Sequence, residues 1–126
     1  MSLLMSQSKY RQLANALGPA VNRSQLMPYS IPVGEESGDE TVALYVVENA
    51  AGRACYGGQT SPAGELPGAA ARRIRQHLRE PAKARYWNRY WVIPMYTGTD
   101  AESLGQLERA LNARVGVRLK RRLPFR

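Results

Sequence analysis

The alternation of apolar and polar positions predicts a chain that begins with a short helix. Residues 6–17 fit a helical pattern because Leu13 and Leu17 fall on one face, and a Gly-Pro pair directly after them would end the helix. The segment 21–40 contains several prolines and glycines and ends in an acidic cluster, which is typical of a loop. We therefore expect residues 1–40 to form an N-terminal helix and linker.

A β-hairpin is predicted next. Residues 41–48 are rich in β-branched and aromatic side chains, and 53–57 form a second short run beyond a turn at 49–52. With a four-residue loop, Tyr45 lies directly opposite Tyr56 on one face of the hairpin. The pair has two interpretations, because it either only stabilises the hairpin by packing or also brings two phenolic hydroxyls to one site. A one-residue slip in register would separate the two side chains.

The second half of the chain predicts a helix, a strand and a helix. Gly68–Glu80 would form a helix closed by a proline, and Asn88–Tyr96 would form a third strand. Thr99–Val115 would form the last helix, opened by a capping box in which Thr99 pairs with Glu102. The apolar stripes of the two helices are Ala70, Ile74 and Leu78, and then Leu104, Leu107 and Leu111. The expected fold class is α+β, with a small three-stranded antiparallel sheet flanked by helices and an N-terminal helical extension.

Length and charge narrow the class of protein. The 126 residues suit one compact domain, which we place at 41–117, followed by a basic tail at 118–126. Lys and Arg number 18 against 10 Asp and Glu, for a net charge of +8, and 15 of the basic residues are arginine. Arginine suits bidentate phosphate contacts, although a GC-rich genome would also enrich it. Residues 109–126 carry seven basic groups and no acidic one, which favours nucleic acid over a membrane as partner.

Other classes are excluded by what the sequence lacks. Cys55 is the single cysteine and His77 the single histidine, so an internal disulfide and a metal site built from several Cys or His side chains are both excluded. No apolar run approaches the length of a membrane-spanning helix, and the N-terminus does not resemble a secretory signal. We expect a cytoplasmic protein that uses no small-molecule cofactor.

Two positions on the predicted helices suggest chemistry. Arg73 and His77 lie four residues apart on one face, where an arginine could neutralise a phosphate and a histidine could move a proton. A solvated basic face with a partly buried histidine is the alternative. Glu108 falls on or beside the apolar stripe of the last helix, where an unpaired carboxylate is costly. It is interpreted either as the partner of Arg73 or another arginine in a salt bridge, or as a Mg²⁺ ligand.

Other basic side chains are candidates for contacts with nucleic acid. They are Arg72, Arg75 and Arg79 on the first predicted helix of the domain, Arg89 in the aromatic run 86–91, and Arg118, Lys120, Arg121 and Arg122 in the tail. Within the aromatic run, Trp87, Arg89 and Trp91 alternate onto one face of a strand. That face would suit either stacking on bases or packing in the core.

These motifs together resemble the GIY-YIG nuclease family. Ala43-Leu44-Tyr45 and, after ten intervening residues, Tyr56-Gly57-Gly58 are similar to the paired motif of that family, and the following Gln59-Thr60 is also typical. The order of elements agrees over about residues 41–115. The chain departs from the family pattern in having Ala43 and Gly57 within the two motifs. It also has no asparagine in 116–126, where many members carry one.

The resemblance implies a metal-dependent endonuclease that hydrolyses phosphodiester bonds in DNA by activated-water attack. It assigns catalysis to Tyr45, Tyr56, Arg73, His77 and Glu108. By analogy, Glu108 binds one divalent cation, Mg²⁺ or Mn²⁺, and Arg73 steadies the scissile phosphate. One tyrosine, helped by the metal or by His77, activates water, and the other orients it. Family members leave a 5′-phosphate and a 3′-hydroxyl.

Two other functions are compatible with the sequence. One is a non-catalytic nucleic-acid-binding module on the same fold, which the missing asparagine and the basic tail would favour. The other is a protein-interaction domain whose basic face meets an acidic protein, or is covered in cis by the acidic segment 35–40. Metal-dependent cleavage separates the nuclease from the other two. The choice of DNA or RNA and the oligomeric state stay open.

Overall fold

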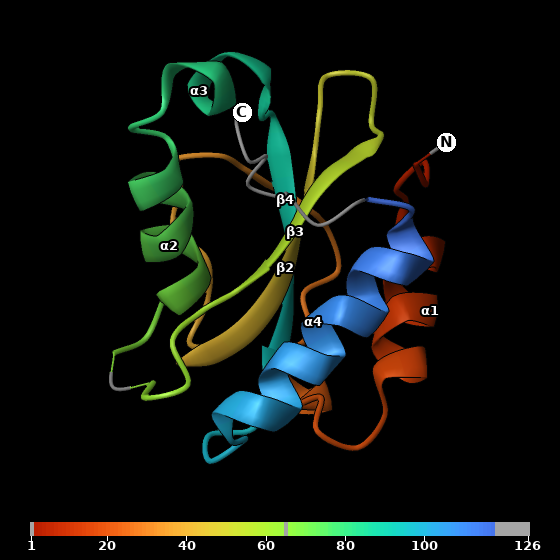
Figure 1. The fold of residues 1–126 in the computed structure, drawn as a ribbon, viewed down its shortest axis with the longest axis vertical. Helices are drawn as coiled ribbons and strands as arrows, with labels where there is room; N and C mark the ends of the chain where they lie inside the picture. The colour runs from red at the N-terminus through yellow and green to blue at the C-terminus, as the bar shows by residue number, and fades with distance from the viewer. Residues whose placement is uncertain (1, 65, 118–126) are drawn as a thin grey trace, which may run out of the picture.

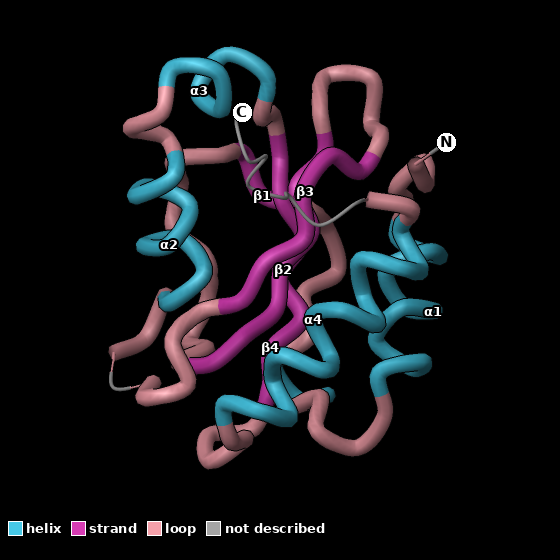
Figure 2. The backbone as a smooth tube through the Cα atoms, viewed as in Figure 1, coloured by secondary structure: helices cyan, strands magenta, loops and turns pink. Residues whose placement is uncertain are grey.

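The computed structural model describes residues 2–64 and 66–117 and has an α+β fold built on an open antiparallel sheet (Figures 1 and 2). The strands are β1 (Ile31–Pro32), β2 (Val42–Glu48), β3 (Ala54–Gln59) and β4 (Arg89–Met95), in the order β1-β4-β2-β3. The helices are α1 (Gln7–Leu17), α2 (Ala69–His77), α3 (Pro81–Tyr86) and α4 (Ala101–Val115), with a 3₁₀ turn η1 at Arg23–Gln25. The predicted α+β class is confirmed.

The sheet has four strands, so the prediction of three is wrong. The additional strand, β1, lies in the segment 21–40 that the sequence predicts as a loop, and it pairs antiparallel with β4, with Ile31 opposite Tyr90. Because β1 has two residues and one of them is a proline, it shows no alternation of apolar and polar positions that could reveal it. The sheet therefore gains a short edge strand beside β4.

Helices cover both faces of the sheet, with α1 and α4 on one side and α2 on the other (Figure 1). The central strand β2 is buried throughout. Its Leu44 and Val46 join the core on the α1–α4 side, whereas Tyr45 and Val47 join the core on the α2 side. This alternation places Tyr45 beneath α2, where the candidate site forms.

The N-terminal helix α1 shares its core with the rest of the chain. Its buried side chains include Leu13 and Leu17, which pack in one cluster with residues of β2, β4 and α4. The hydroxyl of Tyr10 donates a hydrogen bond to the carbonyl of Val92 on β4. In the described part of the chain, no helix is long and apolar enough to cross a membrane.

The helices α2 and α4 confirm the two helices predicted for the second half, but two details differ. The proline expected to end the first one, Pro81, instead occupies the first turn of α3, where its missing N–H costs no hydrogen bond. The N-cap of α4 is Asp100 and not Thr99. The Asp100 carboxylate accepts a hydrogen bond of 2.7 Å from the Ser103 N–H, whereas the Thr99 hydroxyl donates to the Tyr96 carbonyl.

The tryptophans Trp87 and Trp91 lie in opposite cores, so the prediction that they share a strand face is wrong. Trp87 is the C-cap of α3 and precedes β4, so the alternation of that strand does not extend to it. Trp91 packs on the α1 side and donates a hydrogen bond of 2.6 Å from Nε1 to the buried Glu48 carboxylate. Both rings are buried, which favours core packing over stacking on bases.

Candidate functional site

The two hairpin tyrosines lie side by side, although the predicted register is wrong. Tyr45 pairs with Gly58, and Val47 pairs with Tyr56. The turn is one residue longer than expected, and a bulge at Cys55 adds a second residue. Because the total shift is two residues, both tyrosines stay on one face of the sheet. Their ring centroids are 6.2 Å apart across the diagonal, with an interplanar angle of 25°.

Two glycines of β3 make room for this arrangement. A Cβ atom on Gly58 would lie 2.6 Å from Tyr45 Oη and 2.8 Å from Tyr56 Cε2. A Cβ atom on Gly57 would lie 2.6 Å from Oδ1 of Asn112, whose Nδ2 donates to the Gly57 carbonyl from α4. The glycine pair therefore lets the tyrosine rings approach β3 on one face and α4 approach it on the other.

The hydroxyls of the two tyrosines differ in their surroundings. Tyr45 is fully buried, and its Oη has no hydrogen-bond partner among the described residues. Burial and then the neighbouring Tyr56 raise the pKa of Tyr45, while the charge of Arg73 lowers it. Tyr56 is half-buried, and its pKa is raised by burial and by Glu108 and lowered by Arg73. Tyr56 is therefore the tyrosine with access to a ligand.

The single histidine lies against Tyr56. His77 Nε2 is 3.5 Å from Tyr56 Oη, and Nδ1 is 2.8 Å from Lys83 Nζ. The imidazole also packs beside Trp87, with ring centroids 5.2 Å apart. Burial, followed by the charges of Lys83 and Arg73, lowers the pKa of His77 to about 4. The imidazole is therefore neutral at neutral pH.

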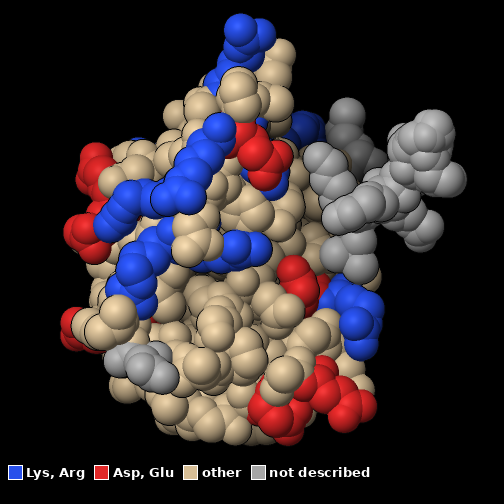
Figure 3. Space-filling model, turned by 60° about the vertical axis from the view of Figure 1, so that its left-hand side comes forward, with Lys and Arg blue, Asp and Glu red and all other residues tan. Residues whose placement is uncertain are grey.

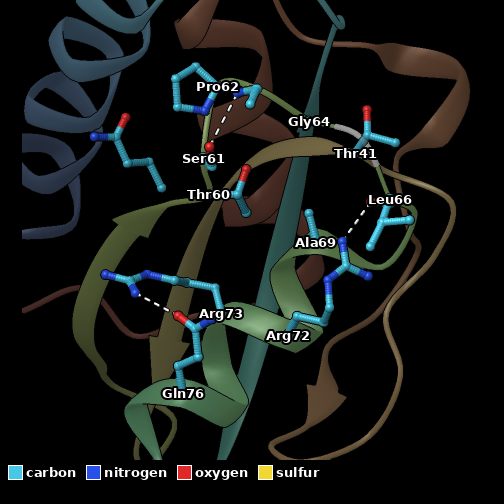
Figure 4. A pocket seen from close by; sticks show the side chains of 12 residues that line it. Thr41, Thr60, Ser61, Pro62, Gly64, Leu66, Ala69, Arg72, Arg73 and Gln76 are labelled. Atoms are coloured by element: carbon cyan, nitrogen blue, oxygen red, sulfur yellow. Dashed lines mark hydrogen bonds between the residues drawn. The ribbon is translucent and has the colours of Figure 1, made fainter.

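Arg73 and Glu108 complete the cluster from opposite helices. Arg73 is exposed on α2, and its Nη1 donates a hydrogen bond of 2.8 Å to Gln76 Oε1 (Figure 4). Glu108 is half-buried on α4, and its pKa is raised by burial and lowered by the charges of Arg109 and Arg73. In the part of the chain that the structure describes, Glu108 forms no salt bridge within 4 Å. Among the described residues, neither Arg73 nor another arginine forms the salt bridge with Glu108 that the sequence offers as one interpretation.

The residues around Glu108 show what kind of metal site this carboxylate could form. The described residues contain no group of three His, Cys, Asp or Glu side chains that could hold a metal by themselves. Mg²⁺, however, keeps several waters and binds through one or two carboxylates together with phosphate oxygens of a substrate. A half-buried carboxylate that has no ion-pair partner among the described residues, and whose charge acts on both tyrosines, fits such a ligand.

A hollow of about 540 Å³ opens beside Arg73, between α2 and the loop that joins it to β3 (Figure 4). Arg72 forms part of its lining and donates hydrogen bonds to the carbonyls of Leu66 and Pro67, so that it holds this loop in place. The two neighbouring arginines thus differ in their surroundings, since Arg72 is hydrogen-bonded to the loop, whereas the charge of Arg73 lowers the pKa of both tyrosines.

The other basic residues that the sequence suggests for contacts with nucleic acid differ in how far they are already engaged by other groups of the protein. Arg75 forms a salt bridge of 2.6 Å with Glu36, and Arg89 donates hydrogen bonds to Ser30, which ties β4 to the start of β1. Arg79 is exposed beyond the end of α2. Figure 3 shows Lys and Arg side chains gathered over the α2 side of the molecule, with acidic side chains among them. The tail candidates Arg118, Lys120, Arg121 and Arg122 lie outside the described residues.

Two residues beside the site are not found by sequence reasoning. Glu40 is buried, and its carboxylate accepts a hydrogen bond of 3.1 Å from the Ala70 N–H, so it caps α2 from the acidic loop. Lys83 reaches His77 from α3. Helical spacing could not indicate the Lys83 contact, because the break between α2 and α3 separates the two residues.

Comparisons of the chain with protein-family models, with curated proteins and with solved structures found no match. The function of the chain must therefore be inferred from the geometry of one cluster of side chains. This cluster joins two phenols, an arginine, a neutral histidine and a carboxylate, carried by β2, β3, α2 and α4.

Proposed function

We propose that this chain is a metal-dependent endonuclease that hydrolyses phosphodiester bonds in DNA, with a site of the GIY-YIG type. The observation that carries the proposal is the cluster in which the Tyr45 and Tyr56 rings lie 6.2 Å apart, with His77 Nε2 3.5 Å from Tyr56 Oη and with the charges of Arg73 and Glu108 acting on both phenols. Hydrolysis of a phosphodiester needs a base, a cation and neutralisation of the phosphate charge. These groups supply each requirement, because Tyr45 and Tyr56 lie on the α2 side of the sheet and the charges of Arg73, on α2, and Glu108, on α4, both act on them.

Each residue has a distinct role in the proposed reaction. Arg73 holds the scissile phosphate, and Glu108 holds a divalent cation, Mg²⁺ or Mn²⁺. When bound, that cation neutralises the phosphate charge. Tyr56, as its phenolate, takes a proton from water while the water oxygen bonds to phosphorus and the bond from phosphorus to O3′ breaks. The departing O3′ takes a proton from solvent, which leaves a 5′-phosphate and a 3′-hydroxyl.

Tyr45, buried on β2 beside Tyr56, has a supporting role in the proposed reaction. Its hydroxyl is buried, so we assign the proton transfer to Tyr56 and give Tyr45 the task of fixing the Tyr56 ring. A phenol is a weak base at neutral pH, because its pKa lies near 10 before burial raises it further. A nearby cation lowers such a pKa, which makes the metal and Arg73 part of the requirement.

A non-catalytic nucleic-acid-binding module on the same fold is the second candidate. It is favoured by the raised pKa of both tyrosines, which keeps the two phenols protonated near neutral pH without a further cation. Both candidates predict binding that weakens with salt, so binding alone does not separate them.

Incubation of supercoiled plasmid with the purified chain, with Mg²⁺ or with a chelator, tests the proposal. We expect Mg²⁺-dependent conversion of supercoiled to open-circular DNA. Binding without conversion, across Mg²⁺ and Mn²⁺ and for single-stranded as well as duplex substrates, would contradict the nuclease and support the binding module.

A further inference from the structure

We infer that Lys83 is a positioning residue of the site. It holds His77 in the tautomer that carries its proton on Nε2, so that the imidazole donates a hydrogen bond to the Tyr56 oxygen. The catalytic meaning of this arrangement rests on the proposed nuclease function, whereas the arrangement itself can be measured without any activity.

The donors and acceptors of Lys83 and His77 determine the tautomer. The ammonium group of lysine has three donors and no acceptor. Lys83 Nζ lies 2.8 Å from His77 Nδ1, so Nδ1 must present its lone pair. A neutral imidazole then carries its single proton on Nε2. That nitrogen faces Tyr56 Oη at 3.5 Å, at the long end of hydrogen-bond distances, and such contacts often tighten only when substrate binds.

Several contacts hold the Lys83 ammonium at this place. Glu80 forms a salt bridge with it of 2.9 Å, and only 14% of the Lys83 side chain is exposed. The ammonium also lies 5.2 Å from the ring centroid of Tyr56 and 5.4 Å from that of Trp87, within cation–π distance of both. The Lys83 side chain thus extends from α3 and packs against the aromatic side chains that surround the imidazole.

The electrostatics agree with the geometry. The titratable or charged groups that act on His77 are Lys83 and Glu80 from α3, Arg73 from α2, and Tyr56, which contacts it from β3. Lys83 and Arg73 both lower the pKa of His77 and Glu80 raises it, after burial as the largest cause. Burial, with the two cations adding to it, therefore keeps the imidazole neutral, which is the state that the contact from Lys83 requires.

This arrangement changes the role of His77. In this tautomer it presents no lone pair to Tyr56, so it cannot take the Tyr56 proton as a base. Its Nε2–H instead donates to the Tyr56 oxygen, and a hydrogen bond to the charged form of a group favours that form. The contacts from Lys83 to His77 and from His77 to Tyr56 thus stabilise the Tyr56 phenolate. When Tyr56 is neutral, they turn its hydroxyl hydrogen away from the imidazole.

The test uses nuclear magnetic resonance on the ¹⁵N-labelled chain. His77 is the only histidine, so long-range proton–nitrogen spectra contain one imidazole. We expect Nδ1 to be unprotonated and Nε2 protonated at pH 7, with an imidazole pKa near the value of about 4 that its surroundings impose. Lys83→Met should raise that pKa and admit the other tautomer. Lys83→Arg should keep the wild-type spectrum, and Arg85→Met, on the exposed side of α3, should leave it unchanged.

A wild-type imidazole protonated on Nδ1, or an unchanged tautomer and pKa in folded Lys83→Met, would overturn the inference. The pH profile of plasmid nicking supplies the second readout. We expect Lys83→Met to lower the rate about tenfold at neutral pH and to recover part of it at alkaline pH, with rescue by Lys83→Arg. The expected tautomer in a chain that never nicks DNA would contradict the nuclease and keep the positioning role. Normal nicking by a chain with the opposite tautomer would contradict the positioning role of Lys83 and leave the proposed nuclease function standing.

Discussion

Tyr45 lies opposite Gly58 on the neighbouring strand, and the absence of a side chain at position 58 lets its ring reach Tyr56. The ring centroids of the two tyrosines are 6.2 Å apart as a result. The longer turn and the bulge at Cys55 together set this diagonal contact, because their combined shift of two residues moves Tyr56 along the strand and keeps it on the same face. The phenolic pair thus depends on backbone geometry as much as on the two tyrosines.

Substitution of Gly58 by alanine tests this dependence. A Cβ atom would lie 2.6 Å from Tyr45 Oη, so the buried ring must move, and overpacking of this kind costs about 1–3 kcal/mol. Urea unfolding should show that loss for Gly58→Ala. Gly105→Ala on α4 is the control, because its Cβ would meet only the Arg109 side chain at 3.9 Å and should stabilise the helix by about 0.5–1 kcal/mol. Equal stability of the two variants would contradict the packing described.

Protonation of His77 should make the fold less stable in mild acid. The pKa of His77 is about 4 in the folded chain against an ordinary histidine value of 6.5, so between these values the unfolded chain binds more protons. The free energy of unfolding should therefore fall as pH drops from about 6.5 to about 4, by about 2–3 kcal/mol. Urea titrations of wild type and His77→Gln over this range isolate the contribution. Parallel pH dependences in the two proteins would refute it.

Arg73 and Arg75 form a matched pair on α2. Arg73 is coupled to both tyrosines and Glu108, whereas Arg75 is engaged by Glu36 at the surface. Arg73→Met should lower the nicking rate about a hundredfold or more through loss of phosphate stabilisation. Arg75→Met should stay within about twofold, because an exposed salt bridge contributes little. Similar losses in both variants would indicate a general effect of charge on DNA binding.

The rate of nicking should rise with pH above 7. Burial and Glu108 raise the pKa of Tyr56, so the phenolate fraction is small at neutral pH and grows as the solution becomes alkaline. Tyr56→Phe should cost about a hundredfold or more and should remove this rise. Tyr86→Phe, at an exposed position, serves as the control. A Tyr56→Phe enzyme with the wild-type rate and pH profile would reduce Tyr56 to a packing residue.

The sequence predicts the main elements because they carry strong local signals. The β-branched run of β2, the stripe through Ile74 of α2 and the stripe through Leu104 and Leu111 of α4 all bury apolar side chains as expected. The pattern fails where pairing is long-range or short. Neither the two-residue β1 nor the bulge at Cys55 leaves a periodic trace, so strand number and register could not be deduced.

Candidate site residues could be predicted where the sequence pattern places a polar side chain at a position that should be buried. Glu108 is an example, since a carboxylate beside an apolar stripe requires an explanation. The partners of the surface arginines could not be predicted in this way. Glu36 engages Arg75, and the loop carbonyls engage Arg72, through contacts set by how the loops fold back on α2. The contact of Lys83 with His77 could not be predicted either, because it crosses the boundary between α2 and α3, where helical spacing no longer applies.

The central claim is that Glu108 holds the cation for phosphodiester hydrolysis, and a matched pair of variants tests it most directly. Nicking of supercoiled plasmid should be measured against Mg²⁺ concentration for wild type, Glu108→Gln and Glu102→Gln, the last at an exposed position in the first turn of α4. We predict that Glu102→Gln follows wild type, whereas Glu108→Gln stays folded, binds DNA and shows no Mg²⁺-dependent nicking. Wild-type nicking by Glu108→Gln would contradict the account.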